Sequence, residues 1–388
     1  AINNGVSATL DVGSGYTVIL ATGFGGGGTG SVTKTGYGTL ILAGDNTYTG
    51  TTTVNYGTLQ LEAGGPTGGI AGNVSGYSGT LTFNYGDAIT FGNTISGSLS
   101  LVQQGTGVLT LSGNNTSWYG TTTINEGKTL RAGSSTATGN GVVTVNGTFD
   151  LNGYSPAVGG LSGGGRVTLG VVGTKTLTIN GSGNNTFSGV IENGSGTVVL
   201  AQAGGGTTNL TGNSTYTGGT TISAGVLSFG NGGLGSSGAI TFAGNSTLQW
   251  NGSNTQDVSS RLAINNGVSA TLDVGSGYTV TLATGFGGGG TGSVTKTGYG
   301  TLILAGDNTY TGTTTVNYGT LSLQRTGGDT LATAGALTIN SSGTLDLGGN
   351  TQHVSGGAVH ILGGTVQNGT LSKSGSDYDG QAGTVTAT

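Results

Sequence analysis

The acidic side chains offer the first chemistry that this sequence could perform. Glycoside hydrolysis requires two carboxyl groups that flank the scissile bond, and Asp377 and Asp379 form the closest acidic pair in the chain. Their two-residue spacing would place both on one face of a strand. A carbohydrate-active enzyme is therefore one hypothesis, but a solvated pair of turn residues explains the spacing more simply and is the interpretation that we favour.

Two histidines and two further acids complete the candidates for chemistry. His353 and His360 are the only histidines, and a metal site needs three or four converging ligands, so we expect surface or ladder positions for both. Asp150 and Asp346 occupy equivalent places in two similar segments, which predicts outward-facing acids that serve solubility. There is no cysteine, no Walker sequence and no calcium-binding nonapeptide. We therefore predict no catalytic, cofactor-binding or metal-binding residues, and a protein that is not an enzyme.

An aromatic residue recurs at one position of a degenerate repeat, between an Asn-Thr or Ser-Thr pair and a glycine. The residues of this aromatic slot are Tyr48, Trp118, Tyr119, Phe187, Tyr216 and Tyr310. A ring at a constant position in each unit indicates a packing residue that covers a corner or a groove, and a platform on which sugars stack is the alternative. Gln249 and Trp250 are a second candidate ligand surface.

These residues belong to a chain that repeats itself. Residues 1–61 return as residues 263–323, and only Ile19/Thr281 and Gln60/Ser322 differ between the two copies. An active site is normally built once, whereas a structural material is repeated. The duplication therefore favours a repeat architecture, in which one continuous unit can have any length.

Composition excludes several classes of protein. Of 388 residues, 88 are glycine but only 2 are proline, which does not fit collagen. Alternating apolar residues and a net charge of −5 argue against disorder. The 9 basic residues are scattered, so a nucleic-acid surface is not expected. No stretch approaches the roughly 20 apolar residues that a membrane helix needs, and we expect no membrane insertion of this segment.

Two-residue alternation predicts short strands throughout the chain. Residues 39–42, 108–111, 148–151, 176–179 and 344–347 alternate in this way, which predicts that apolar side chains point inward while Thr and Asp face water. Glycine and asparagine supply the corners between them. Leu40 and Leu59 occupy equivalent places 19 residues apart in the sequence. Coils of about 20 residues with two or three strands predict an all-β fold, a β-solenoid whose coils stack about 4.8 Å apart.

The repeat unit G-x-G-T-L-x-L-x-G-x-N-T-Y-T-G-x-T-T-V-N-x-G-T-L resembles the autotransporter-associated β-strand repeat of bacterial passenger domains, the passenger-associated transport repeat family. The segments that match are residues 36–61, 298–323, 105–133, 176–200 and 208–229. The resemblance implies a right-handed parallel β-helix that is secreted and displayed on, or shed from, the surface of a Gram-negative-type cell. It also implies a stalk, an adhesin or a fibre.

We predict that residues 1–388 are a single continuous β-solenoid segment, a fragment of a longer array. The predicted function is structural: a stiff extracellular stalk or fibre that builds filaments or matrix and continues covalently or by self-assembly, end to end or laterally. The alternative is an adhesin passenger domain that binds glycans or host proteins through its outer face. A carbohydrate-active enzyme remains a third hypothesis.

Overall fold

The computed structural model describes residues 4–62, 64–65, 67–375 and 377–387. Its contacts divide the chain into two compact units, Ala1–Val199 and Leu200–Thr388. Each unit is a parallel β-solenoid with coils of about 21 residues, which confirms the predicted fold class and coil length. The described residues contain no α-helix and one short 3₁₀ helix, η1 (Ser259–Arg261). None of the described helices is long and apolar enough to cross a membrane.

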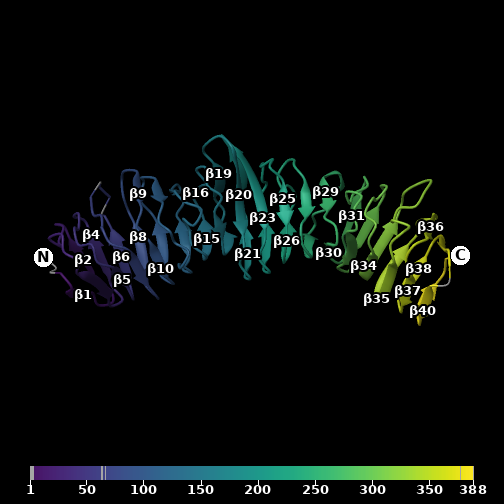
Figure 1. The fold of residues 1–388 in the computed structure, drawn as a ribbon, viewed down its shortest axis with the longest axis horizontal. Coiled ribbons are helices and arrows are strands. Elements are labelled where there is room, and N and C mark those ends of the chain that lie inside the picture. Colours follow the sequence, from purple (N-terminus) through teal and green to yellow (C-terminus); the bar gives the residue numbers. More distant parts are fainter. Residues whose placement is uncertain (1–3, 63, 66, 376, 388) are drawn as a thin grey trace. The chain divides into compact units, whose positions relative to one another are not determined.

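In the first unit, strands of successive coils line up as parallel walls (Figure 1). One wall contains β1 (Ser7–Asp11), β3 (Ser31–Thr35), β5 (Thr52–Val54), β7 (Val74–Gly76) and β10 (Ile95–Gly97). The next contains β2 (Thr17–Leu20), β4 (Thr39–Leu42), β6 (Thr58–Leu61), β8 (Thr80–Phe83), β11 (Ser100–Gln103), β13 (Thr122–Ile124), β15 (Val142–Val145) and β18 (Gly160–Ser162). A third wall contains β9 (Ile89–Phe91), β12 (Leu109–Leu111), β14 (Thr129–Ala132), β16 (Thr148–Asp150), β19 (Arg166–Leu169) and β22 (Val190–Gly194). The remaining strands of this unit are β17 (Ala157–Val158), β20 (Thr174–Ile179) and β21 (Asn184–Phe187).

The second unit is built in the same way. One wall contains β24 (Thr207–Leu210), β26 (Val226–Phe229), β28 (Ser246–Trp250), β30 (Ser269–Val274), β32 (Ser293–Thr297), β34 (Thr314–Leu323), β35 (Leu337–Asp346), β37 (Val359–Leu362) and β40 (Tyr378–Gln381). β34 also pairs with β33 (Thr301–Leu304), which pairs with β31 (Thr279–Leu282). β35 likewise pairs with β38 (Thr365–Gln367), which pairs with β41 (Thr384–Val385). The other strands are β25 (Thr220–Ile222), β27 (Ile240–Phe242), β29 (Leu262–Ile264), β36 (Thr351–Val354) and β39 (Thr370–Lys373), while β23 (Thr197–Gln202) contains the boundary between the units.

Like residues face like residues from coil to coil, because the register repeats the sequence motif. Leu40 pairs with Leu59, and Leu59 pairs with Leu81. All three side chains are buried. The threonine that precedes each leucine pairs with its counterpart and is only half-buried. Each buried leucine contributes about 1.5–3 kcal/mol relative to an exposed one, so the apolar ladders are the main stabilising element of each unit.

Asp150 departs from the expected solubility role. Its side chain is buried, whereas the sequence predicted an outward acid. The carboxylate forms an ion pair with Arg131 at 3.1 Å and accepts the backbone N–H groups of Asn152 and Gly170 at 2.9 Å. A buried carboxylate is tolerated only when it is paired in this way. Asp346 is half-buried, and its carboxylate accepts hydrogen bonds from the side-chain amides of Gln367 and Asn368.

Candidate functional site

The slot tyrosines lie inside the solenoid. Tyr48, Tyr216 and Tyr310 have no exposed surface, and a ring without exposed surface does not contact a ligand outside the coil. Each phenol oxygen lies 2.7–2.8 Å from the hydroxyl of the threonine four residues later, the partners being Thr52, Thr220 and Thr314. Burial raises the pKa of all three tyrosines to about 12, and the threonine hydrogen bond offsets part of this increase. The pairs therefore satisfy polar groups within the core.

The remaining slot residues lack the tyrosine–threonine hydrogen bond. Trp118 is buried and donates its indole N–H to the carbonyl of Leu99 at 2.8 Å. Phe187 is also buried, and the residue four positions later is Ile191 instead of threonine. Tyr119, by contrast, is 65% exposed. Among the slot residues, Tyr119 is thus the one whose ring is available to a ligand.

Trp250 does not provide the ligand surface that we expected at Gln249 and Trp250. The indole is only 2% exposed, packs against Phe229 with ring centroids 5.4 Å apart, and donates to the carbonyl of Gln256 at 2.9 Å. Alternation along β28 explains the arrangement, because Leu248 and Trp250 share the inward face. Gln249 lies on the outward face and is half-buried.

The acids and histidines form separate pairs instead of one site. His353 Nδ1 lies 3.0 Å from Asp329 Oδ1, and His360 Nδ1 lies 3.8 Å from Asp379 Oδ2. Asp377 precedes β40 and is exposed. No three His, Asp or Glu side chains in the described part of the chain converge as a metal site requires. The structure thus places one member of the Asp377–Asp379 pair against a histidine of the neighbouring coil.

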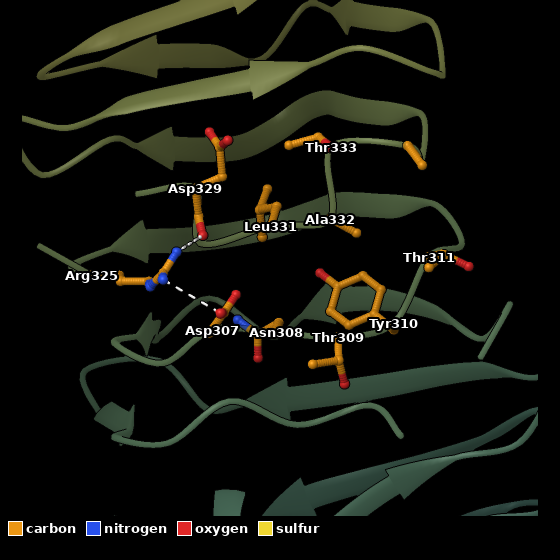
Figure 2. A pocket seen from close by; sticks show the side chains of 11 residues that line it. Asp307, Asn308, Thr309, Tyr310, Thr311, Arg325, Asp329, Leu331, Ala332 and Thr333 are labelled. Carbon is orange, nitrogen blue, oxygen red and sulfur yellow. Dashed lines mark hydrogen bonds and ion pairs between the residues drawn. The ribbon is translucent and has the colours of Figure 1, made fainter. Parts of the chain in front are cut away.

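A cavity of about 390 Å³ lies in the second unit beside Arg325 (Figure 2). Arg325 donates to the backbone carbonyl of Asp329 at 2.6 Å and contacts the Asp307 carboxylate at 3.4 Å. Figure 2 shows the Asp329 carboxylate turned away from Arg325, and it accepts the backbone N–H of His353 instead. The two carboxylates at this cavity therefore serve different partners and do not form an acid–base pair.

Exposed tyrosines at one corner of the coils form a feature that our sequence reasoning missed. The rings of Tyr37 and Tyr56 have centroids 5.3 Å apart in the first unit, and those of Tyr299 and Tyr318 are also 5.3 Å apart in the second. All four rings are exposed. The signal was present, because each of these tyrosines directly precedes or follows a corner glycine in the duplicated segment.

A buried lysine supports each of these corners. Lys34 pairs with Leu10 and Val54 in the inner ladder and has no exposed surface. Its equivalent, Lys296, donates to the carbonyls of Thr297 at 2.6 Å, Gly298 at 2.7 Å and Tyr318 at 3.2 Å. Burial lowers the pKa of both lysines, to about 8 for Lys296, and Asp273 offsets part of that effect. The three carbonyls that accept from the ammonium group compensate for its removal from water.

Comparison with known proteins agrees with this geometry. The passenger-associated-transport-repeat model matches residues 32–61, 101–132, 200–229 and 294–323, and each matched segment contains at least one slot aromatic. The looser resemblance at 176–200 is not among the matched segments. The chain is 34% identical, over an alignment of 411 positions, to the adhesin BmaC autotransporter of Brucella suis biovar 1 (strain 1330). That alignment covers 91% of this chain and 12% of the adhesin. No solved structure gives a significant match. The chain thus carries four passenger-associated transport repeats, and these repeats together with the likeness to the adhesin indicate a secreted cell-surface protein.

Proposed function

We propose that residues 1–388 form one continuous β-solenoid segment of a passenger region and act as a stiff extracellular stalk or fibre, without catalysis. The observation that supports this proposal is the in-register ladder within each unit, where Leu302 pairs with Leu321 and Leu321 with Leu345. Every coil in such a ladder is hydrogen-bonded to its neighbours, so that bending requires many bonds to deform together.

The same ladder is self-complementary. A terminal coil of a parallel solenoid presents N–H and C=O groups that can pair with another coil. We propose that the array continues in this way, through covalently linked coils or through end-to-end or lateral contacts between copies.

Negative-stain electron microscopy of the 388-residue chain across a concentration series tests this proposal. We expect filaments of constant width whose length increases with protein concentration. Compact globules would contradict the stalk, and discrete particles of unchanging length at every concentration would contradict self-assembly.

An adhesin is the second candidate function. The similar Brucella protein is named an adhesin, and the exposed tyrosine pairs supply rigid amphipathic contact area of the kind enriched in binding surfaces. Fluorescent beads coated with the chain should then adhere to host cells, and beads coated with heat-unfolded chain should not. Equal binding of both preparations would contradict this function.

The absence of catalysis is part of the first proposal and has its own test. Asp377, Asp379 and the carboxylates of the Arg325 cavity have separate surroundings, as described above. We expect no turnover of a panel of acidic and neutral polysaccharides by the purified chain. Turnover that disappears in the Asp377→Asn/Asp379→Asn variant would establish an enzyme instead.

A further inference from the structure

Exposed tyrosines follow one corner of successive coils in the second unit. Tyr278 precedes β31, Tyr299 lies two residues before β33, and Tyr318 lies on β34 at the equivalent place of the next coil. Tyr299 is 68% exposed and Tyr318 is 43% exposed. Their rings are tilted by 56° to each other. Tyr299 and Tyr318 therefore form a row of two aromatic faces at the same place of neighbouring coils, along the direction in which the coils stack, whereas Tyr278 lies one position nearer to its strand.

The backbone under this row is rigid. Lys296 lies beneath the corner and donates to carbonyls of two successive coils, including that of Tyr318. Gly319 allows the close approach of those coils, since a Cβ there would lie 2.4 Å from the carbonyl oxygen of Gly300 and 2.8 Å from the carbonyl carbon of Tyr299. Rings held in position before a ligand arrives lose little entropy on binding.

A hollow continues the row on the next coils. It has a volume of about 390 Å³ and is lined by Asn317, Tyr318, Asn340, Ser341, Ser342 and Leu362. The register places Ser342 opposite Tyr318 and Leu362 opposite Asn340, so the hollow follows the coil axis. These six residues carry amide and hydroxyl groups, one aromatic ring and one apolar side chain, and none of them is charged.

We propose that this row of tyrosines and the hollow beyond it bind an uncharged linear polysaccharide of β-1,4-linked pyranoses that lies parallel to the coil axis. The apolar C–H face of a pyranose stacks on an aromatic ring, and amides and hydroxyls hydrogen-bond the sugar hydroxyls. The 5.3 Å between the rings of Tyr299 and Tyr318 is close to the advance per sugar in an extended β-1,4-linked chain. The uncharged lining favours a neutral glycan over an acidic one.

The first unit contains a second, simpler version of the site. The Tyr37–Tyr56 pair has the same 5.3 Å spacing, and Lys34 donates to the carbonyl of Tyr56. The next coil presents Tyr77, which is exposed, in place of the hollow. The second-unit site should therefore bind more tightly. This inference rests on the adhesin candidate above and names the chemistry of its ligand.

Isothermal titration calorimetry of the 388-residue chain with cellohexaose tests the site. We expect two binding sites in the wild type, one in Tyr299→Ala/Tyr318→Ala, and none when Tyr37→Ala/Tyr56→Ala is added. Tyr318→Ala alone should weaken the tighter site about tenfold, which is within the range measured for flat rings that stack on aromatic side chains. Maltohexaose, which is α-linked, and a hexamer of galacturonic acid should bind at least about tenfold more weakly.

Tyr119→Ala is the matched control, because Tyr119 is 65% exposed but belongs to no exposed ring pair among the described residues. It should leave the cellohexaose affinity unchanged. The inference is overturned if the wild type does not bind cellohexaose, if the ring-pair variants bind like the wild type, or if Tyr119→Ala weakens binding equally. Adhesion of coated beads to cells without cellohexaose binding would overturn this inference alone, and cellohexaose binding without adhesion would overturn the adhesin candidate alone.

Discussion

The phenol oxygen of Tyr310 lies 2.8 Å from the hydroxyl oxygen of Thr314, and both side chains are buried. The same pair recurs as Tyr48 with Thr52 and as Tyr216 with Thr220. Two polar groups that would each be costly to bury alone thus satisfy one another inside the coil. The spacing of four residues between tyrosine and threonine is therefore a packing rule of this repeat.

Tyr310→Phe should lower the free energy of unfolding by about 1–3 kcal/mol, because the Thr314 hydroxyl is left buried without a partner. Urea denaturation followed by circular dichroism measures the change. Adding Thr314→Val should recover most of the loss, since neither polar group then remains. A Tyr310→Phe variant as stable as the wild type would show that the hydrogen bond contributes nothing.

Thr122→Val should raise the free energy of unfolding by about 1–3 kcal/mol. Trp118 occupies the slot position four residues earlier, and its indole N–H donates to the backbone carbonyl of Leu99. The buried hydroxyl of Thr122 therefore has no hydrogen-bond partner. Valine has the same shape without the unsatisfied group. Thr123→Val, on the outward face of β13, is the control and should change stability by less than about 0.5 kcal/mol. A destabilised Thr122→Val variant would contradict this account.

Stability should rise with pH from about pH 8 towards pH 10 through Lys296. The pKa of this lysine is lowered to about 8 by burial, whereas an unfolded lysine titrates near about 10.4. Between these values the unfolded chain holds a proton that the folded chain has released, so stability increases with pH. The desolvation cost is fully present below the folded pKa and disappears as the pH approaches the unfolded value.

Urea midpoints of the wild type and Lys296→Met, measured at intervals between about pH 7.5 and 9.5, test this expectation. The wild type should gain stability relative to the variant as the pH rises. Measurements stop below pH 10 because the pKa values of the buried tyrosines are raised to about 12. Above pH 10 the unfolded chain loses tyrosine protons that the folded chain keeps, which lowers the stability of the folded protein. Parallel curves for the two proteins would contradict the lowered pKa.

Arg261→Met should destabilise the second unit by at least about 2 kcal/mol, because hydrogen bonds to charged groups contribute more than neutral ones. Its guanidinium donates to four carbonyls of one turn, those of Leu234, Gly235, Ser237 and Gly238, at 2.6–3.1 Å. Arg261→Lys should lose part of this stability, since lysine lacks the planar fork of donors. Limited proteolysis should show earlier cleavage at residues 234–238 in both variants, and an unchanged cleavage pattern would count against this role.

The sequence alone determined the class of fold and its repeat. Alternation with a period of two and corner glycines are local properties, so the strands, the inward leucines and the coil of about 20 residues followed from them. The slot aromatics were also recognised, with packing as the favoured interpretation. The family resemblance was readable because the motif at residues 36–61 is long and returns at residues 298–323.

Only the tertiary structure decided which side chains meet, because partners lie on neighbouring coils about 20 residues apart. Lys34 lies on the inward face of β3 with Val32, and the stacking of the coils brings three carbonyls within reach of its ammonium group. Asp150 was misjudged because its partners Arg131 and Gly170 lie on neighbouring coils, whereas the inward position of Trp250 follows from alternation along β28 and could have been predicted. The spacing of Tyr299 and Tyr318 is likewise a property of register, which sets the distance between corners that the sequence leaves 19 residues apart.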